Sequence, residues 1–250
     1  MTYQTRQTPA EAGFISNNNL QTAYDIFVDG DYAYVPSYNS GLLEIIDISL
    51  PENPVGAGNY SNDNLRGASG VFARGGDYAY VTSMETGTLA IINISDPVNP
   101  VETGSLSNEN MGGAFGVSVT GDYACVACMN SNTLAVIDIS DPENPVEAAS
   151  IFGEQINGPI GVSVSGKYAY VTGMGSNNLE IIELGVYEEL SGSYVVEPGL
   201  STPLLNAGAI VSQHAEDLWG NINSLTTLPP LSILPMAVRL PLTEGLHTLC

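Results

Sequence analysis

The chain repeats itself about every 45 residues, and this repeat constrains its fold more than any other feature. The segments GDYAYV, GDYAYV, GDYACV and GKYAYV carry Tyr32, Tyr78, Tyr123 and Tyr168, at intervals of 46, 45 and 45 residues. The related turns SLPENPV, SDPVNPV and SDPENPV begin at residues 49, 95 and 140. A period of this length is typical of arrays in which each unit buries its hydrophobic faces against its neighbours. One unit alone would not be stable.

Each unit predicts four short antiparallel strands. A small-residue stretch such as GVSV (116–119) leads through a Gly-Asp turn into the YAYV strand. A nearly continuous apolar run follows, for example LAVIDIS (134–140), as expected for a strand that is covered on both faces. Proline then ends that strand, and the variable segment after NPV forms an outer edge. We therefore predict an all-β fold, a β-propeller of four-stranded antiparallel blades.

The two ends of the repeat array complement each other. Residues 9–16, PAEAGFIS, match PVETGSLS (100–107), so they correspond to the last strand of a blade. The fourth unit loses its match after Leu184, where such a strand should follow. We expect the N-terminal strand to complete the fourth blade and close the ring, because closure removes exposed strand edges. A ring of four blades in one chain, a ring of eight from two chains and a fragment of a longer array all fit the sequence.

The segments LAVIDISDPENPVEAAS (134–150) and GVSVSGKYAYV (161–171) resemble the LVIVD-repeat β-propellers, a family of bacterial and archaeal proteins, many of them exported or surface-attached. The resemblance covers roughly residues 9–185. It implies a propeller scaffold for extracellular binding or adhesion, and it brings no catalytic motif. The opening MTYQTRQTPAEAG lacks the apolar core of a secretory signal peptide, which departs from the exported members.

Residues 186–250 differ from the repeats, and residues 1–8 form a short N-terminal tail. Thirteen of residues 186–250 are Leu, against ten of the residues before them. The frequent prolines of LPPLSILPMAVRLPL (228–242) disfavour a long helix. We expect this Leu/Pro-rich segment to pack on the propeller or to mediate assembly of a homo-oligomer. A poorly ordered tail or an altered reading of the gene's end is the other alternative.

The charge balance excludes two classes of partner. The chain carries 27 acidic residues but only 5 basic ones, which gives a formal net charge of -22. Nucleic-acid backbones and anionic membranes are bound by Lys and Arg, and a negative field repels them. No stretch reaches the ~18 apolar residues of a membrane span. We therefore expect no nucleic-acid partner, no membrane span and an acidic, solvated surface; divalent cations or a high-salt habitat are the alternative reasons for the charge.

One polar position recurs inside the apolar run, as Asp47, Asn93, Asp138 and Glu183. A charge in that setting must be paired or hydrogen-bonded, and each side chain could satisfy a backbone amide of the neighbouring turn. In a closed ring, Asp47, Asp138 and Glu183 could instead hold a cation. These three residues are therefore the metal candidates of the sequence.

Loops rich in Asn, Asp and Ser recur at one edge of the blades, as SNNN (16–19), SNDN (61–64) and SNEN (107–110). Such residues are turn formers, and their oxygens could also coordinate Ca²⁺, although the spacing and the bidentate Glu of an EF-hand are missing. We expect no cofactor, with Ca²⁺ as the alternative. The candidate binding-loop residues are Asn62, Asp63, Asn64, Asn108, Glu109 and Asn110.

Three observations argue against catalysis. Cys125 and Cys128 have the spacing of a redox or zinc pair, but residues three apart in a strand point to opposite faces, and no second pair completes a metal site. We expect them to be structural thiols. No His precedes His214, and the repeats contain neither a GxSxG elbow nor a phosphate loop. Near-identical units also indicate a scaffold rather than one asymmetric site.

These observations favour a non-enzymatic scaffold that binds a protein or glycan ligand at the cell surface through loops at one end of the ring. A structural subunit of a surface layer or extracellular fibre is the first alternative. A hydrolase-like propeller enzyme is the second. The binding module and the structural subunit differ in assembly size, because only the subunit should form very large particles.

Overall fold

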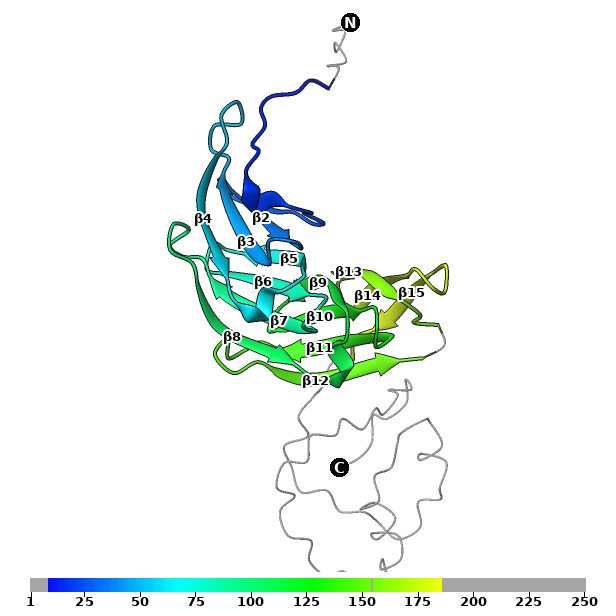
Figure 1. Cartoon of the computed structure of the whole chain (residues 1–250). Helices are drawn as coiled ribbons and strands as arrows, with labels where there is room; N and C mark the ends of the chain where they lie inside the picture. Colours follow the sequence, from blue (N-terminus) through cyan, green and yellow to red (C-terminus); the bar gives the residue numbers. More distant parts are fainter. Residues whose placement is uncertain (1–8, 154, 186–250) are drawn as a thin grey trace, which may run out of the picture. The chain divides into compact units, whose positions relative to one another are not determined.

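The computed structural model describes residues 9–153 and 155–185. These residues form strands and short 3-10 helices without an α-helix, and they include no helix that is long and apolar enough to cross a bilayer. The strands make four antiparallel sheets in chain order, here called blades 1 to 4 (Figure 1). The all-β prediction and the division of the repeats into four blades are confirmed.

The strands and 3-10 helices have the following bounds. Blade 1 consists of β1 (Phe27–Asp29), β2 (Tyr32–Ser37), β3 (Leu42–Asp47) and β4 (Val55–Ser61). Blade 2 consists of β5 (Ala68–Arg74), β6 (Tyr78–Ser83), β7 (Thr88–Asn93) and β8 (Val101–Ser107). Blade 3 consists of β9 (Ala114–Thr120), β10 (Tyr123–Cys128), β11 (Thr133–Asp138) and β12 (Val146–Phe152), and blade 4 of β13 (Pro159–Ser165), β14 (Tyr168–Gly173) and β15 (Asn178–Glu183). The 3-10 helices are η1 (Asn18–Leu20), η2 (Asp63–Leu65) and η3 (Glu109–Met111).

Each blade pairs its strands in the order of the sequence, with the outer strands β4, β8 and β12 along the outside in Figure 1. The first turn of blades 1, 3 and 4 places Gly30, Gly121 and Gly166 at φ of 59°, 53° and 57°, a region that glycine enters without steric cost. Blade 2 uses Gly75 and Gly76 there, so its one extra residue is absorbed in this turn. Consecutive strands of a blade run in opposite directions. The loops between the second and third strands and the loops after the fourth strand therefore lie at the same end of the blades, which we call the loop end.

The third strand is the most deeply buried part of each complete blade, as its apolar run predicts. The first five residues of β3, β7 and β11 are all buried, and only the last is half-buried. Alternate side chains of such a strand point to opposite faces of the sheet, so both faces must be covered. A blade therefore needs a neighbour on each side.

Consecutive blades supply this cover for each other. We call the face toward the preceding blade the leading face and the opposite one the trailing face. Leu43 and Ile45 on the trailing face of blade 1 pack with Val71 and Ala73 on the leading face of blade 2. Two further clusters join blades 2 and 3 and blades 3 and 4 in the same way. The hydrophobic core is thus divided into layers between the sheets.

Blade 4 contains three strands in the described part of the chain, and β15 pairs only with β14. Residues 9–16 form no strand, and they lie beside blade 1. Ile15 and Leu20 pack against a cluster on its leading face. Residues 9–16 do not pair with β15 of the same chain, so the closed ring stays a prediction.

Residues 9–16 nevertheless occupy the place of an outer strand. A Cβ atom added to Gly13 would lie 2.3 Å from the carbonyl oxygen of Pro51 in the next turn. Gly58 of β4 and Gly104 of β8 show the same approach, at 2.3 Å and 2.4 Å from the equivalent proline carbonyl oxygens. The segment therefore has the position of the fourth strand of a blade that precedes blade 1.

The predictions for residues 1–8 and 186–250 fall outside the described residues. The packing of the Leu/Pro-rich segment on the propeller, and its role in a homo-oligomer, therefore stay predictions.

Candidate functional site

The metal candidates Asp47 and Asp138 are the last residues of β3 and β11, as Asn93 is of β7. The Oδ1 atom of Asp47 accepts hydrogen bonds from the backbone N and the hydroxyl of Ser49, at 2.9 Å and 2.6 Å. Asn93 and Asp138 bind the serine two residues further on in the same manner. The Ser49 hydroxyl bond lowers the pKa of Asp47 below its ordinary value. These side chains satisfy local backbone amides, which is the first of the two expectations drawn from the sequence.

Glu183 differs from the other three residues of this repeat position. Its Oε1 atom lies 2.6 Å from Nζ of Lys167 in an ion pair that is exposed to solvent. No three His, Cys, Asp or Glu side chains of residues 9–153 and 155–185 are grouped so that they could hold a metal ion. The proposed site at Asp47, Asp138 and Glu183 and the Ca²⁺ idea gain no support from this geometry and stay predictions.

Four of the six predicted binding-loop residues use their side chains to join neighbouring blades. The side-chain amides of Asn62 and Asn64 donate to the two carboxylate oxygens of Glu102 on β8, at 2.6 Å and 3.0 Å. Asn108 and Asn110 donate in the same way to Glu147 on β12. The first Asn of each pair also accepts from the backbone N of the second and caps η2 or η3.

The same arrangement occurs at the start of the array. Asn17 and Asn19 donate to Oε1 and Oε2 of Glu44, at 2.9 Å and 2.8 Å. Glu44 lies on β3 and is buried, with 3% of its surface exposed. We call this unit of two amides and one carboxylate the amide clamp. It pairs a buried charge with two donors and links each outer segment to the next blade.

Asp63 and Glu109, the remaining predicted loop residues, are the first residues of η2 and η3. Glu109 is exposed, whereas Asp63 lines an open pocket together with Asn62. Of the six predicted loop residues, only Asn62 and Asp63 line the pocket.

The cysteines are structural, as expected. Cys125 lies in the cluster between blades 3 and 4, and Cys128 lies in the cluster between blades 2 and 3. Their side chains thus point to opposite faces, and both are free thiols. Burial raises the pKa of each thiol to about 12. A thiol that stays protonated at neutral pH is a poor nucleophile and a poor metal ligand.

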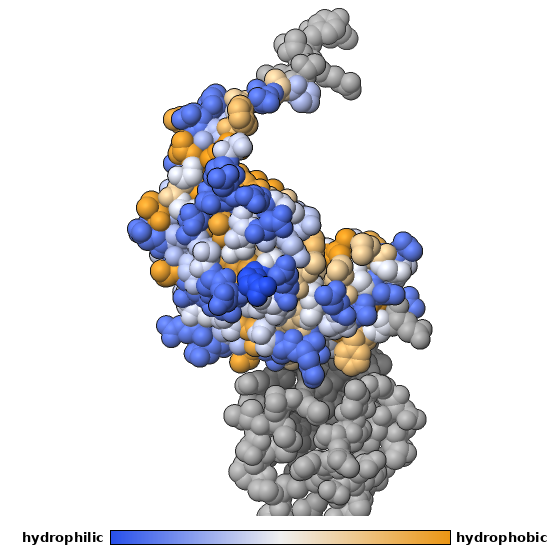
Figure 2. Space-filling view, viewed as in Figure 1, coloured by the Kyte–Doolittle hydropathy of each residue, from blue (hydrophilic) through white to orange (hydrophobic). Residues whose placement is uncertain are grey.

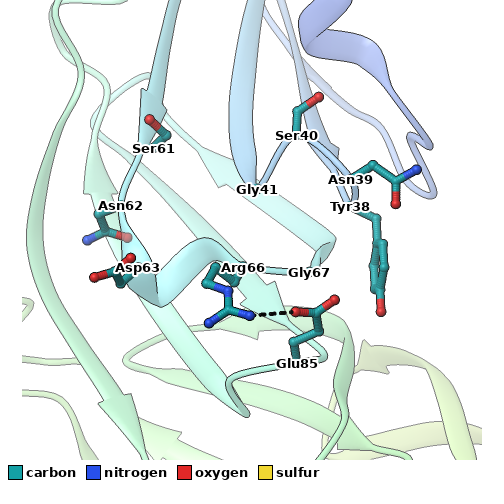
Figure 3. A pocket seen from close by; sticks show the side chains of 10 residues that line it. All are labelled: Tyr38, Asn39, Ser40, Gly41, Ser61, Asn62, Asp63, Arg66, Gly67 and Glu85. Atoms are coloured by element: carbon teal, nitrogen blue, oxygen red, sulfur yellow. Dashed lines mark ion pairs between the residues drawn. The ribbon is translucent and has the colours of Figure 1, made fainter.

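The pocket lies at the loop end of blades 1 and 2 and has a volume of about 640 Å³. This is within the range of small-ligand sites. Figure 3 shows Asn62 and Asp63 on one side, Asn39 and Tyr38 on the other, and an ion pair between them. The lining residues are Tyr38, Asn39, Ser40, Gly41, Ser61, Asn62, Asp63, Arg66, Gly67 and Glu85.

Three lining residues, Tyr38, Arg66 and Glu85, depart from the repeat. The other units carry Met84, Met129 and Met174 in place of Tyr38, Gln21, Gly112 and Asn157 in place of Arg66, and Asn39, Asn130 and Gly175 in place of Glu85. Tyr38 is thus the single exception at a position that carries Met elsewhere, whereas the positions of Arg66 and Glu85 vary among the units. No other unit combines an aromatic ring, a guanidinium and a carboxylate at these positions, so the pocket differs chemically from the equivalent places of the other blades.

These three side chains contact one another. Nη2 of Arg66 lies 3.6 Å from Oε2 of Glu85 (Figure 3). A hydrogen bond to the Glu85 carboxylate is the main reason why the pKa of Tyr38 is raised above its ordinary value. The Tyr38 ring also meets Tyr24 edge to face, with ring centroids 5.5 Å apart. Glu85 is therefore oriented by a guanidinium on one side and a phenol on the other.

The backbone around the pocket is fixed by hydroxyl groups. Thr86 donates to the carbonyl oxygen of Asn64 at 2.8 Å, and Ser83 donates to that of Arg66. Gly67 has a φ of 76°, and a Cβ there would lie 2.7 Å from Cγ of Glu85. Glycine thus permits the close approach that brings Glu85 over the end of η2.

The pocket offers a carboxylate pair, amides, hydroxyls and one guanidinium beside an aromatic ring. Such a set can donate and accept several hydrogen bonds at once, while the ring covers an apolar face of the ligand. The sequence analysis named Asn62 and Asp63 but missed Tyr38, Arg66 and Glu85. The available signal was departure from the repeat, together with the scarcity of basic residues, of which Arg66 is one of 5.

Comparison with known proteins supports the repeat. A family model described as the LVIVD repeat matches residues 22–62, 67–107, 111–152 and 160–183. No curated protein sequence is similar enough to count as a match.

Several solved structures share the fold. The chain is similar to the hydrazine synthase of Kuenenia stuttgartiensis (TM-score 0.55, 18% identity, 71% of this chain and 50% of that chain). It is also similar to the periplasmic gluconolactonase PpgL of Pseudomonas aeruginosa (TM-score 0.56, 15% identity, 64% and 49%) and to the computationally designed Ika4 protein (TM-score 0.55, 10% identity, 71% and 100%). The chain spans about half the length of the two natural proteins, and at these identities the likeness shows the fold alone.

Proposed function

Since the chain belongs to the LVIVD-repeat family, we propose that it is a non-enzymatic β-propeller scaffold that binds a glycan in the pocket of Tyr38, Arg66 and Glu85. The observation that carries the proposal is that Tyr38, Arg66 and Glu85, a combination that no other unit has, meet in one polar pocket. The rest of the repeat serves as a rigid support for these loops.

The composition of the pocket favours a neutral, hydroxyl-rich ligand. Sugar hydroxyls both donate and accept, and the carboxylates of Asp63 and Glu85 accept while Arg66 donates. Tyr38, which is half-buried, presents a ring on which the apolar face of a sugar can rest. The chain's net charge of -22 repels anionic ligands, and Glu85 already neutralises Arg66.

Binding is favoured over catalysis by the residue types present. The ten residues that line the pocket include no His, Cys or Lys, the groups that most often serve as base or nucleophile. We further propose a role in adhesion at the cell surface, which rests on the family resemblance. A structural subunit is the second candidate, because apolar faces lie open at both ends of the blade array.

The test is binding to an immobilised panel of neutral mono- and oligosaccharides. The wild-type protein is compared with the variant Tyr38→Met/Arg66→Gly/Glu85→Asn, which gives blade 1 and blade 2 the residues that other units carry at these positions. We expect the wild type to bind at least one saccharide of the panel and the variant to lose at least 90% of the signal. Because each substitution already occurs in a sister unit, the fold should be kept, as circular dichroism and thermal unfolding will check.

Val98→Glu is the matched control. Val98 is 61% exposed in a turn at the opposite end of the blades, where the sister units carry Glu52 and Glu143. This variant should bind as the wild type does. A wild type that binds no saccharide, or a triple variant that binds equally well, contradicts the proposal.

A further inference from the structure

The trailing face of blade 4 is an exposed copy of faces that are buried elsewhere. Leu43, Leu89 and Leu134 on the third strands are fully buried, whereas Leu179, at the same position of β15, is 58% exposed. The next position on the trailing face shows the same contrast. Ile181 is 58% exposed, whereas its counterparts in β3, β7 and β11 are buried. In Figure 2 the face in view is mainly hydrophilic, and apolar residues show over the fourth blade at the right.

The leading face of blade 1 also exposes apolar side chains that are buried in the other blades. Val71 of blade 2 and Val117 of blade 3 are 3% and 8% exposed, but Ile26 at the same position of blade 1 is 60% exposed. Val28 of β1 is likewise open, at 54%. Within the array, side chains at these positions pack against the trailing face of the preceding blade. The face that fits Leu179 and Ile181 is therefore the face that carries Ile26 and Val28.

A segment in the position of an outer strand is also present without a sheet, and blade 4 is a sheet without an outer strand in the described residues. Residues 9–16 hold the place of an outer strand before blade 1, with Gly13 against the Pro51 carbonyl. Blade 4 lacks a strand beside β15 in the described residues. If the leading face of a blade 1, together with its residues 9–16, docks on the trailing face of a blade 4, both exposed faces are covered and β15 gains a neighbouring strand.

We propose that a second copy of this chain supplies that contact, so that two chains close one ring of eight blades. Each chain then contributes residues 9–16 to the fourth blade of its partner, and the two identical contacts continue the blade-to-blade interface already present three times in one chain. A two-fold axis relates the copies, and among the described residues the two open blade faces and the unpaired edge of β15 are covered.

The geometry favours two chains over a ring of four blades within one. The hydrophobic clusters of residues 9–153 and 155–185 join only consecutive blades, and none joins blade 1 to blade 4. A four-blade ring needs a rotation of about 90° per blade, against about 45° for eight blades.

The experiment measures the mass of the full chain in solution by light scattering over a concentration series. The proposal predicts a particle of two 26.2-kDa chains that does not grow further. Ile181→Glu alters the trailing face of blade 4, and Ile26→Glu alters the leading face of blade 1. Each variant alone should have half the mass of the wild type, because each ring contact then carries one charged, desolvated side chain.

A mixture of the two variants distinguishes this head-to-tail contact from any other. The Ile26→Glu chain keeps an intact blade 4, and the Ile181→Glu chain keeps an intact blade 1, so one contact can form. The mixture should therefore contain a two-chain particle that neither variant forms alone. Val98→Glu, an equally exposed apolar position, should leave the wild-type mass unchanged.

Three outcomes overturn the proposal. A wild-type chain of single mass means that its own residues cover the faces or that they stay open. A mass that rises without limit indicates a filament and favours the structural-subunit function. Variants that keep the double mass place the contact elsewhere. Circular dichroism of each variant verifies that the fold is retained, and none of these results depends on saccharide binding in the pocket.

Discussion

Asn62 donates its side-chain amide to Glu102 at 2.6 Å, across 40 residues of sequence and from one blade to the next. With Asn64 it saturates both oxygens of that carboxylate. The blades are therefore joined at the loop end by polar contacts as well as by the apolar layers between the sheets. Apolar layers alone would allow neighbouring sheets to slide, whereas a two-point contact to a carboxylate fixes their register.

Removing the carboxylate of one amide clamp should destabilise the array. Glu102→Ala leaves the amides of Asn62 and Asn64 without their acceptor, and we expect the free energy of unfolding to fall by about 1 to 3 kcal/mol. Urea unfolding followed by circular dichroism measures this. Glu109→Ala, at an exposed position of η3, is the control and should change stability by less than about 0.5 kcal/mol. Equal effects of the two substitutions would argue against the clamp.

The clamp carboxylate comes from different strands in different blades, and this can be tested by moving it. Blade 1 has Glu44 on β3, and a Cβ added to Gly56 on β4 would lie 3.3 Å from its carboxylate. Blade 2 has Ala90 and Glu102 at these positions. Ala90→Glu and Glu102→Gly should each destabilise blade 2, and the double variant should recover about 0.5 to 3 kcal/mol relative to the sum of the single effects. Strict additivity would contradict the equivalence of the two arrangements.

The close approach of outer strands to the next turn depends on glycine. A Cβ on Gly104 would lie 2.4 Å from the carbonyl oxygen of Pro142, so Gly104→Ala must shift backbone atoms and should cost about 1 to 3 kcal/mol. Gly153 has no atom within 4 Å of its added Cβ and no positive φ. Gly153→Ala should therefore be neutral within about 0.5 kcal/mol. Thermal unfolding of both variants measures these changes in stability. A neutral Gly104→Ala would show that the blades are packed less tightly than described.

The buried thiols predict a specific pH dependence. In the folded chain the pKa of Cys125 and Cys128 is about 12, against 9.0 for an ordinary thiol. Above pH 9.0 the unfolded chain releases these protons while the folded chain keeps them, so the free energy of unfolding falls as the pH rises from 9.0 toward 12. In a Cys250→Ser background, neither thiol should react with a disulfide reagent at pH 8 until the chain is unfolded. Rapid labelling of the folded protein would contradict their burial.

The strands were predictable because the repeat and the local chemistry agree. The run from Leu134 to Ile139 is apolar on both faces, and the proline turns separate it from the outer strand, so β11 and its counterparts followed from the sequence. The pocket was not predicted because Tyr38, Arg66 and Glu85 come from three loops, and only the fold brings these departures from the repeat together.

The amide clamp could not be found by aligning the units. Its asparagines recur in register, but Glu44 lies on a third strand, while Glu102 and Glu147 lie on fourth strands. No single position of the aligned repeat units therefore carries an acidic residue in every unit. The three carboxylates serve equivalent asparagine pairs only in three dimensions, because the third and fourth strands are neighbours in the sheet.

The central claim is that residues 9–16 are the missing strand beside β15. In blade 2, Thr88 pairs with Ser107, so the same register places Ser16 opposite Asn178. A chain with Ser16→Cys and Asn178→Cys in the Cys250→Ser background, oxidised under native conditions, tests this most directly, because a disulfide requires Cα atoms within about 7 Å.

Two chains that close one ring should give a disulfide between chains, seen as a species of twice the mass under denaturing, non-reducing conditions. The out-of-register pair Ser16→Cys and Leu179→Cys should give little. A disulfide within one chain would contradict the two-chain ring, and equal yields or no disulfide from the in-register pair would contradict the claim that residues 9–16 belong beside β15.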